Sequence, residues 1–227
     1  MVNSSRSEKD PCAEANQASI NLTNLSKQAK YSEGKIAVQD AVANDPANNK
    51  KEHAVAFGKD ANGNIIRSNV ITGTPNSGTI PSITNRFSDL HNHTDNKPPS
   101  SGDLYGFIDL AITNPNYTRY IITSNGTVYS LALINKQAAI NFNANYPRQP
   151  AIGGFEPNFP EALVDEYNQA MGWGNATNEM ATAFILSKYN AGVALLKQDD
   201  NGNFKRLNTK EHTDANGSKT YTSNNCK

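Results

Sequence analysis

Two histidines and an aspartate lie close together near the middle of the chain, on either side of a turn rich in proline and serine. His91 and His93 are two residues apart, so on a β-strand both imidazoles leave the same face. Asp103 begins a stretch with apolar residues at helical spacing, and the turn can fold it back towards the histidines. Two imidazoles and a carboxylate suit a borderline ion such as Zn²⁺. The sequence therefore predicts a metal site built from these three residues.

The number and kind of these ligands favour a catalytic metal over a structural one. Three protein ligands leave one coordination position open, whereas structural zinc sites usually have four ligands, often cysteines. No cysteine lies near the two histidines in the sequence. The competing interpretation is a solvated polar loop, because a His-x-His pair also arises by chance on a polar strand. The additional Ser100-x-x-Asp103 pattern after the histidines favours the metal site.

A zinc hydrolase also needs a group that takes a proton from water and returns it to the leaving amine. Glu52 is the candidate, because it begins an apolar strand and its carboxylate could occupy a half-buried cleft that raises its pKa. The alternative is an ordinary glutamate at the edge of a strand. His53 would point to the opposite face of a regular strand, so it is left out of the site.

The order of these residues resembles the signature of the JAMM zinc metalloproteases, also called JAB or MPN-plus: a glutamate, then HxH, then SxxD. The matching positions here are Glu52, His91-Asn92-His93 and Ser100-Ser101-Gly102-Asp103. The resemblance covers about Glu52 to Ile134 and looks closest to bacterial JAB-like domains, including short ones attached to secreted or polymorphic-toxin proteins. It departs in the turn, where the spacing from His93 to Ser100 is one residue shorter than usual and Thr94 replaces a frequent proline.

The resemblance implies both a fold and a set of roles. The fold would be the cytidine-deaminase-like JAB/MPN fold. The implied roles are Zn²⁺ ligands for His91, His93 and Asp103, proton transfer for Glu52, and polarisation of the substrate carbonyl oxygen for Ser100. Ser101 would restore the usual distance from His93 but breaks the SxxD pattern, so Ser100 is preferred.

Charge and hydropathy exclude some classes of partner. The chain has 21 basic and 21 acidic residues, so no net charge favours nucleic acid or an anionic membrane. No apolar run is long enough for a membrane span, and the N-terminus lacks the apolar core of a signal peptide. The expected partner is a peptide or protein substrate, and the oligomeric state stays open.

The two cysteines lie near opposite ends of the chain. A disulfide between Cys12 and Cys226 would tie the terminal regions together and could stabilise the fold by about 4 to 5 kcal/mol in the chain-entropy model. Such bonds persist in oxidising compartments, so this pairing favours an exported protein that is periplasmic, on the cell surface or secreted. The alternative is two unrelated free thiols.

The pattern along the chain predicts an α/β (α+β) fold, with a mixed β-sheet flanked by helices. We expect a polar N-terminal tether over 1–12, a JAB-like core over 13–134, and a C-terminal helical and hairpin elaboration over 135–227 packed on the same domain. Helices are predicted over 13–29, 36–43, 103–113, 160–171 and 177–189, and strands over 52–57, 65–71, 87–93, 117–123, 127–134, 192–197 and 204–207. No structure is assigned to 135–158, and the tail 212–227 is expected to be polar and held mainly by Cys226.

These expectations describe a zinc metallopeptidase that hydrolyses a peptide or isopeptide bond through a metal-activated water. Three alternatives stay open: a non-catalytic JAB-like binding module, a secreted effector or toxin domain, and a structural protein without a metal. The sequence does not choose among a host protein, a cell-wall peptide and a ubiquitin-like conjugate as the substrate.

Overall fold

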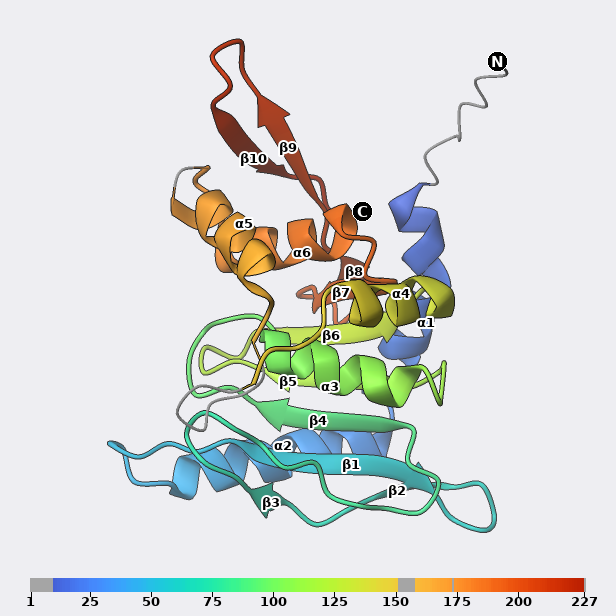
Figure 1. Cartoon of the computed structure of the whole chain (residues 1–227). Helices are drawn as coiled ribbons and strands as arrows, with labels where there is room; N and C mark the ends of the chain where they lie inside the picture. The colour runs from blue at the N-terminus through green and yellow to red at the C-terminus, as the bar shows by residue number, and fades with distance from the viewer. Residues whose placement is uncertain (1–9, 151–157, 173, 227) are drawn as a thin grey trace.

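A computed structural model describes residues 10–150, 158–172 and 174–226. A mixed, open β-sheet forms the centre, with strand order β2-β1-β4-β5-β6-β7-β8 and with β3 also paired to β1 (Figure 1). Its strands are β1 (His53–Lys59), β2 (Ile65–Arg67), β3 (Ile71–Thr72), β4 (Ser88–Asn92), β5 (Thr118–Ile122), β6 (Val128–Leu133), β7 (Val193–Gln198) and β8 (Phe204–Arg206). Strands β9 (Thr209–Thr213) and β10 (Lys219–Ser223) form a separate two-stranded hairpin.

Six helices of the described residues flank the large sheet. They are α1 (Pro11–Ser26), α2 (Ala29–Asn44), α3 (Ser101–Ala111), α4 (Lys136–Asn145), α5 (Glu161–Gly172) and α6 (Asn178–Lys188). Helices α1 and α2 cover one face of the sheet, whereas α3 and α4 lie on the other (Figure 1). The mixed α/β arrangement agrees with the fold class expected from the sequence.

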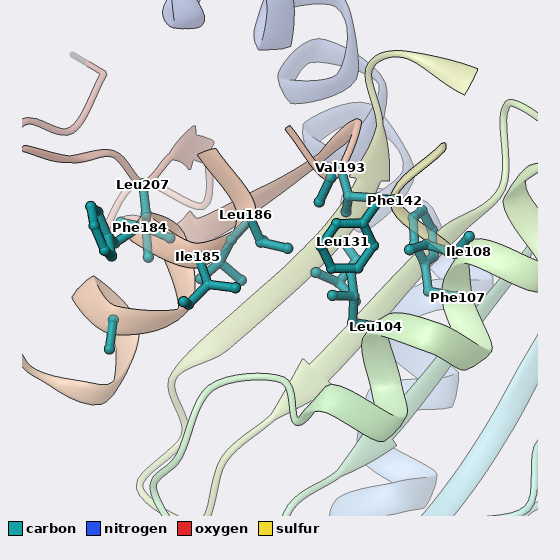
Figure 2. Close-up of a cluster of buried hydrophobic side chains, with 14 of the residues drawn as sticks. Leu104, Phe107, Ile108, Leu131, Phe142, Phe184, Ile185, Leu186, Val193 and Leu207 are labelled. Carbon is teal, nitrogen blue, oxygen red and sulfur yellow. The ribbon is translucent and has the colours of Figure 1, made fainter. Parts of the chain in front are cut away.

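The buried side chains form two hydrophobic cores, one on each face of the large sheet. Val55, Leu90 and Tyr120 belong to the core under α1 and α2. Leu131 and Leu195 belong to the opposite core, which is completed by side chains from α3 to α6 (Figure 2). Because successive side chains of a strand point to opposite faces, β6 and β7 contribute to both cores, whereas β4 places the polar Asp89 and His91 on the face opposite Leu90.

The parallel pairing of β4 with β5 determines where the histidines lie. Parallel neighbours need a crossover connection, and α3 provides it between these two strands. The carboxyl end of β4 therefore lies beside the first turn of α3. Ligand sites of α/β sheets form at such carboxyl ends, and here His91 and His93 lie at the end of β4.

The structure corrects the expectations at several elements. Helix α2 starts at Ala29 rather than at residue 36, and its first turns bury Tyr31 and Gly34. The unassigned segment contains α4, whose start is capped by the side chain of Asn135. Seven residues of that segment, 151–157, lie outside the described residues, as do residues 1–9 of the expected tether.

The expectation for the C-terminal tail was wrong. Residues that we expected to be held mainly by Cys226 form the β9–β10 hairpin, which projects from the rest of the molecule (Figure 1). Tyr221 of β10 is buried, and its ring packs edge-on against Phe184 of α6 at 4.9 Å. Packing of Tyr221 thus helps to attach the hairpin to α6. The polar composition of these residues gave no strand pattern from which the hairpin could be predicted.

The expected disulfide between Cys12 and Cys226 is confirmed. It joins the first turn of α1 to the chain beyond β10, with Cα atoms 5.5 Å apart. Asp10 and Pro11 start α1, since the Asp10 side chain accepts a hydrogen bond from the Cys12 backbone and proline suits the first helical turn. A disulfide agrees with an exported protein. No helix in the described part of the chain is both long and apolar enough to cross a membrane.

Candidate metal centre

The structure brings His91, His93 and Asp103 together in one buried group. The Nε2 atom of His91 lies 3.0 Å from Asp103 Oδ1, and that of His93 lies 3.0 Å from Asp103 Oδ2. All three side chains are buried, and their candidate ligand atoms lie within 4.8 Å of one another. The group could hold a metal ion, as the sequence predicted for these three residues.

The outer nitrogen atoms of the two imidazoles differ in their hydrogen bonding. His93 Nδ1 lies 3.1 Å from the carbonyl oxygen of Lys97, and donation to that oxygen leaves the Nε2 lone pair free to bind a metal. His91 Nδ1 is buried, and it has no hydrogen-bond partner among the residues that the structure describes. A metal-bound histidine usually donates its second ring N–H to a partner, so His91 lacks the support that the Lys97 carbonyl oxygen gives to His93.

The charges in the group depend on one another. Burial lowers the pKa of His93, but the hydrogen bond and negative charge of Asp103 outweigh burial and raise that pKa to about 9. Burial raises the pKa of Asp103, but both imidazoles together hold it well below its usual range. The carboxylate is therefore ionised at neutral pH, and Arg119 Nη1 lies 3.9 Å from its Oδ1. A proton on the imidazoles or a metal ion can supply further positive charge beside it.

A second buried cluster lies under the metal group and was missed in the sequence. Asp89 precedes His91 by two residues on β4. Arg119 on the adjacent strand β5 pairs directly with Asp89. Arg119 Nε donates to Asp89 Oδ1 at 2.9 Å, and the hydroxyl of Tyr117 donates to Asp89 Oδ2 at 2.6 Å. Arg119 Nη1 also donates to the main-chain oxygen of Asp103 at 3.0 Å. The sequence signals that could have predicted this cluster are the alternating patterns Asp-x-His-x-His and Tyr-x-Arg, because alternate residues of a strand share one face.

Asn92, between the two histidines, fixes the backbone around Glu52. Its Oδ1 accepts a hydrogen bond from His53 N at 2.7 Å, and its Nδ2 donates to Lys51 O at 3.1 Å. These bonds bracket Glu52, which directly precedes β1 and is buried. The strand with the histidines therefore positions the chain that carries the glutamate. This bidentate role of the residue inside HxH was also missed in the sequence.

Glu52 and His93 line the same cavity, whereas His53 lies outside it. His53 Nε2 contacts Asp45 Oδ2 at 2.9 Å, and its Nδ1 contacts Thr72 Oγ1 at 3.1 Å. The imidazole of His53 thus ties β1 to the end of α2 and to β3. Leaving His53 out of the predicted site agrees with this placement.

Ser100 begins α3 through a reciprocal pair of hydrogen bonds with Asp103. Ser100 Oγ accepts from Asp103 N at 3.0 Å, and Ser100 N donates to Asp103 Oδ2 at 2.8 Å. This is a capping box, so the Ser-x-x-Asp pattern has a structural reason as well as the catalytic one expected from the resemblance. The cap also orients the Asp103 carboxylate towards the histidines. Ser101 is the first residue of the helix.

The cavity beside the metal group has a volume of about 330 Å³ and two different walls. One wall is polar and includes Glu52, His93 and Ser100. The other consists largely of apolar side chains from α3, β6, α5 and α6. The volume is at the low end of the range of roughly 300 to 1,000 Å³ that is typical of ligand pockets.

No model of a known protein family matches the chain, and no curated protein matches it either. The α/β architecture and the buried group of two histidines and an aspartate are compatible with the JAMM resemblance. The resemblance therefore depends on the motif residues and their geometry alone.

Proposed function

We propose that this protein is a zinc-dependent metallopeptidase of the JAMM type, with a JAB/MPN fold, that hydrolyses a peptide or isopeptide bond. One observation carries the proposal: two imidazoles converge on one buried carboxylate at the edge of a cavity that a buried glutamate also lines. A purely structural site would close with a fourth ligand, often a cysteine. Both cysteines of this chain are joined in the disulfide.

The donor set favours zinc. His91 and His93 offer Nε2 atoms and Asp103 offers a carboxylate oxygen, which is a ligand set used by catalytic zinc. A zinc ion held there would supply Lewis acidity and would lower the pKa of a water bound to it to about 7. Arg119 and Ser100 hold the Asp103 side of the group in place, and the Lys97 carbonyl oxygen orients His93.

Glu52 and Ser100 take the two remaining roles. Glu52 accepts a proton from the attacking water and returns it to the leaving nitrogen, because its carboxylate shares the cavity with His93. Ser100 Oγ accepts the Asp103 backbone hydrogen, so its own proton is the one that donates to the carbonyl oxygen as negative charge develops there. In the structure Ser100 Oγ donates this proton to Asp103 Oδ2 at 2.9 Å, so the role requires the hydroxyl to turn from the carboxylate to the substrate.

The proposal extends to the organisation and location of the protein. Residues 13–134 form the catalytic core, and residues 135–227 are an elaboration packed on the same domain, since β7 pairs with β6 and continues the core sheet. The disulfide supports an exported location. A secreted effector with the same chemistry is compatible with these features.

Metal content of the purified protein tests the proposal. After zinc is supplied and excess removed, wild type and Glu52→Gln should each hold about one zinc per chain, and His93→Ala should hold much less. His212→Ala is the matched control, because it removes an exposed imidazole of β9 that lies outside the metal group. Wild-type protein without zinc would contradict the proposal.

Hydrolysis separates an enzyme from a binding module. Zinc-loaded wild type should cleave peptide or isopeptide substrates, and Glu52→Gln should lower the rate by about a hundredfold or more, as expected for loss of a general base. A protein that binds zinc but shows equal, background rates for wild type and Glu52→Gln would be a non-catalytic module. Equal but substantial rates would show that Glu52 is not the proton carrier.

A further inference from the structure

The apolar wall of the cavity is formed mainly by side chains that lie outside the motif-bearing core. Phe159 and two residues of α5, Val164 and Tyr167, face the cavity together with Leu186 of α6. Leu104 of α3 and Leu131 of β6 complete the wall. Figure 2 shows Leu104, Leu131 and Leu186 approaching one another where these three elements meet.

Part of this wall stays partly exposed, although Phe159 and Tyr167 also pack against the protein core. Leu104, Leu131 and Leu186 are buried, as core residues should be. Val164, however, is 36 % exposed, and Phe159 and Tyr167 are only half-buried. The described residues thus leave part of the apolar surface of these three side chains exposed at a cavity that Glu52 and His93 also line. Exposed apolar surface inside a concave site is typical of a ligand pocket.

The charged residues of the cavity lie away from this wall. Those among the lining residues of the described chain are Glu52, Asp95 and Lys97, besides His93, and none comes from α5 or α6. Lys97 Nζ and Asp95 Oδ2 are 3.0 Å apart and form an ion pair with each other. A charged side chain of a ligand would therefore find no oppositely charged residue of α5 or α6 in the cavity, whereas an apolar side chain would lose contact with water.

We propose that this wall binds an apolar side chain of the substrate residue that supplies the scissile carbonyl. The inference rests on the proposed function, because it takes the reacting bond to lie at Glu52 and His93. The small volume of the cavity fits one large side chain beside that bond. The substrate class is thus a peptide or isopeptide with leucine, phenylalanine or a similar residue on its acyl side. The C-terminal helices α5 and α6 determine this specificity.

Binding of short hydroxamates to the zinc-loaded full chain tests the pocket without turnover. The probes are the hydroxamates of N-acetyl-leucine, N-acetyl-phenylalanine and N-acetyl-alanine, with dissociation constants measured by calorimetry. We expect the leucine and phenylalanine compounds to bind about ten to a hundred times more tightly than the alanine compound, because their side chains leave water. Glu52→Gln should keep this preference, since it removes the proton carrier and leaves the wall intact.

Two variants of α5 add the same charge at different places. Val164→Glu places a carboxylate on the apolar wall and should reduce the preference for leucine over alanine to about threefold or less. Gln169→Glu is the matched control, because residue 169 is exposed on the same helix and does not line this cavity. This control should keep the wild-type preference.

The outcomes separate the two proposals. Equal affinities for leucine and alanine hydroxamates, or a preference that survives Val164→Glu, would overturn the apolar pocket and leave the metal site standing. Elemental analysis of the same samples reports on zinc. A chain that takes up no zinc, or a zinc-loaded chain that binds none of the three hydroxamates, would overturn the proposed function, and the pocket with it.

Discussion

Arg119 connects the two strands and the helix that build the candidate metal centre. Its Nη1 donates to the main-chain oxygen of Asp103 at 3.0 Å, while its Nε donates to Asp89 on β4 at 2.9 Å. Burial lowers the pKa of Arg119, but the charge of Asp89 outweighs burial and raises that pKa above its usual value. The first turn of α3 is therefore fastened to the sheet by a permanently charged side chain.

Replacing Arg119 should weaken both the fold and the metal site. Arg119→Met leaves the buried Asp89 with the Tyr117 hydroxyl but without a cation, and we expect the free energy of unfolding to fall by about 3 to 5 kcal/mol. Metal affinity, measured by competition with a chelator, should fall by about ten- to a hundredfold because Asp103 loses its support. Lys30→Met is the control, since it breaks an exposed ion pair with Glu33 that contributes less than about 1 kcal/mol. Wild-type stability of Arg119→Met in urea would contradict this view of the cluster.

Two substitutions of Ser100 distinguish the helix cap from a role at the substrate. Ser100→Ala should cost about 1 kcal/mol of stability, whereas Ser100→Gly should cost only a few tenths, since glycine is tolerated as an N-cap. If the hydroxyl stabilises the oxyanion, as we propose, Ser100→Gly should keep its stability and zinc but lose about a hundredfold or more in kcat. Full activity of the stable Ser100→Gly variant would show that Ser100 only caps α3 and does not stabilise the oxyanion.

Breaking the disulfide should destabilise the whole fold and leave the metal group assembled. The bond closes a loop with a sequence separation of 214 residues, so Cys12→Ser with Cys226→Ser should lower the free energy of unfolding by about 5 kcal/mol in the chain-entropy model. Urea denaturation measures this change, and zinc content at low urea measures the site. Loss of zinc in the folded double variant would show that the terminal regions support the site more directly than the contacts indicate.

Acid should weaken the attachment of α5 through Glu166. Burial raises the pKa of this carboxyl, but hydrogen bonds from Lys188 and Tyr189 outweigh burial, so the folded-state pKa lies below the usual 4.5. A lowered carboxyl pKa means that the stabilisation is present above pH 4.5 and is lost as pH falls through the folded value. Wild type should therefore be more stable than Glu166→Gln at pH 7, by less than about 1 kcal/mol because the lysine of the pair is partly exposed. The difference in urea midpoint should shrink below pH 4.5, and a difference that grows in acid would contradict this assignment.

The expectations that depended on neighbouring residues agree best with the structure. The helix after the proline-rich turn was predicted from local spacing. Its cap by Ser100 and the turns at Asn62-Gly63 and Asn125-Gly126 also depend on local geometry. Gly63 and Gly126 both have positive φ, as those turns require. The placement of His91 and His93 on one face of β4 follows from the same local alternation.

Elements without a strong local pattern were missed. Helix α4 lies in an asparagine-rich segment, and its formation depends on burial of Ala139 and Phe142 against the core. The β9–β10 hairpin is polar, and its attachment depends on Tyr221. In both cases a few distant contacts outweigh weak intrinsic propensities, and such contacts are invisible in a window of the sequence.

The sequence by itself determined which chemical groups are available: two imidazoles, a carboxylate and a serine in one segment, an upstream glutamate, and cysteines near both ends. Only the tertiary structure decided how they meet. Parallel pairing of β4 with β5 places Arg119 beside Asp89, the Asn92 side chain brackets Glu52, and α5 and α6 form the apolar wall. The physical reason is range, because periodicity and capping act over a few residues, whereas strand pairing and burial join segments far apart in the chain.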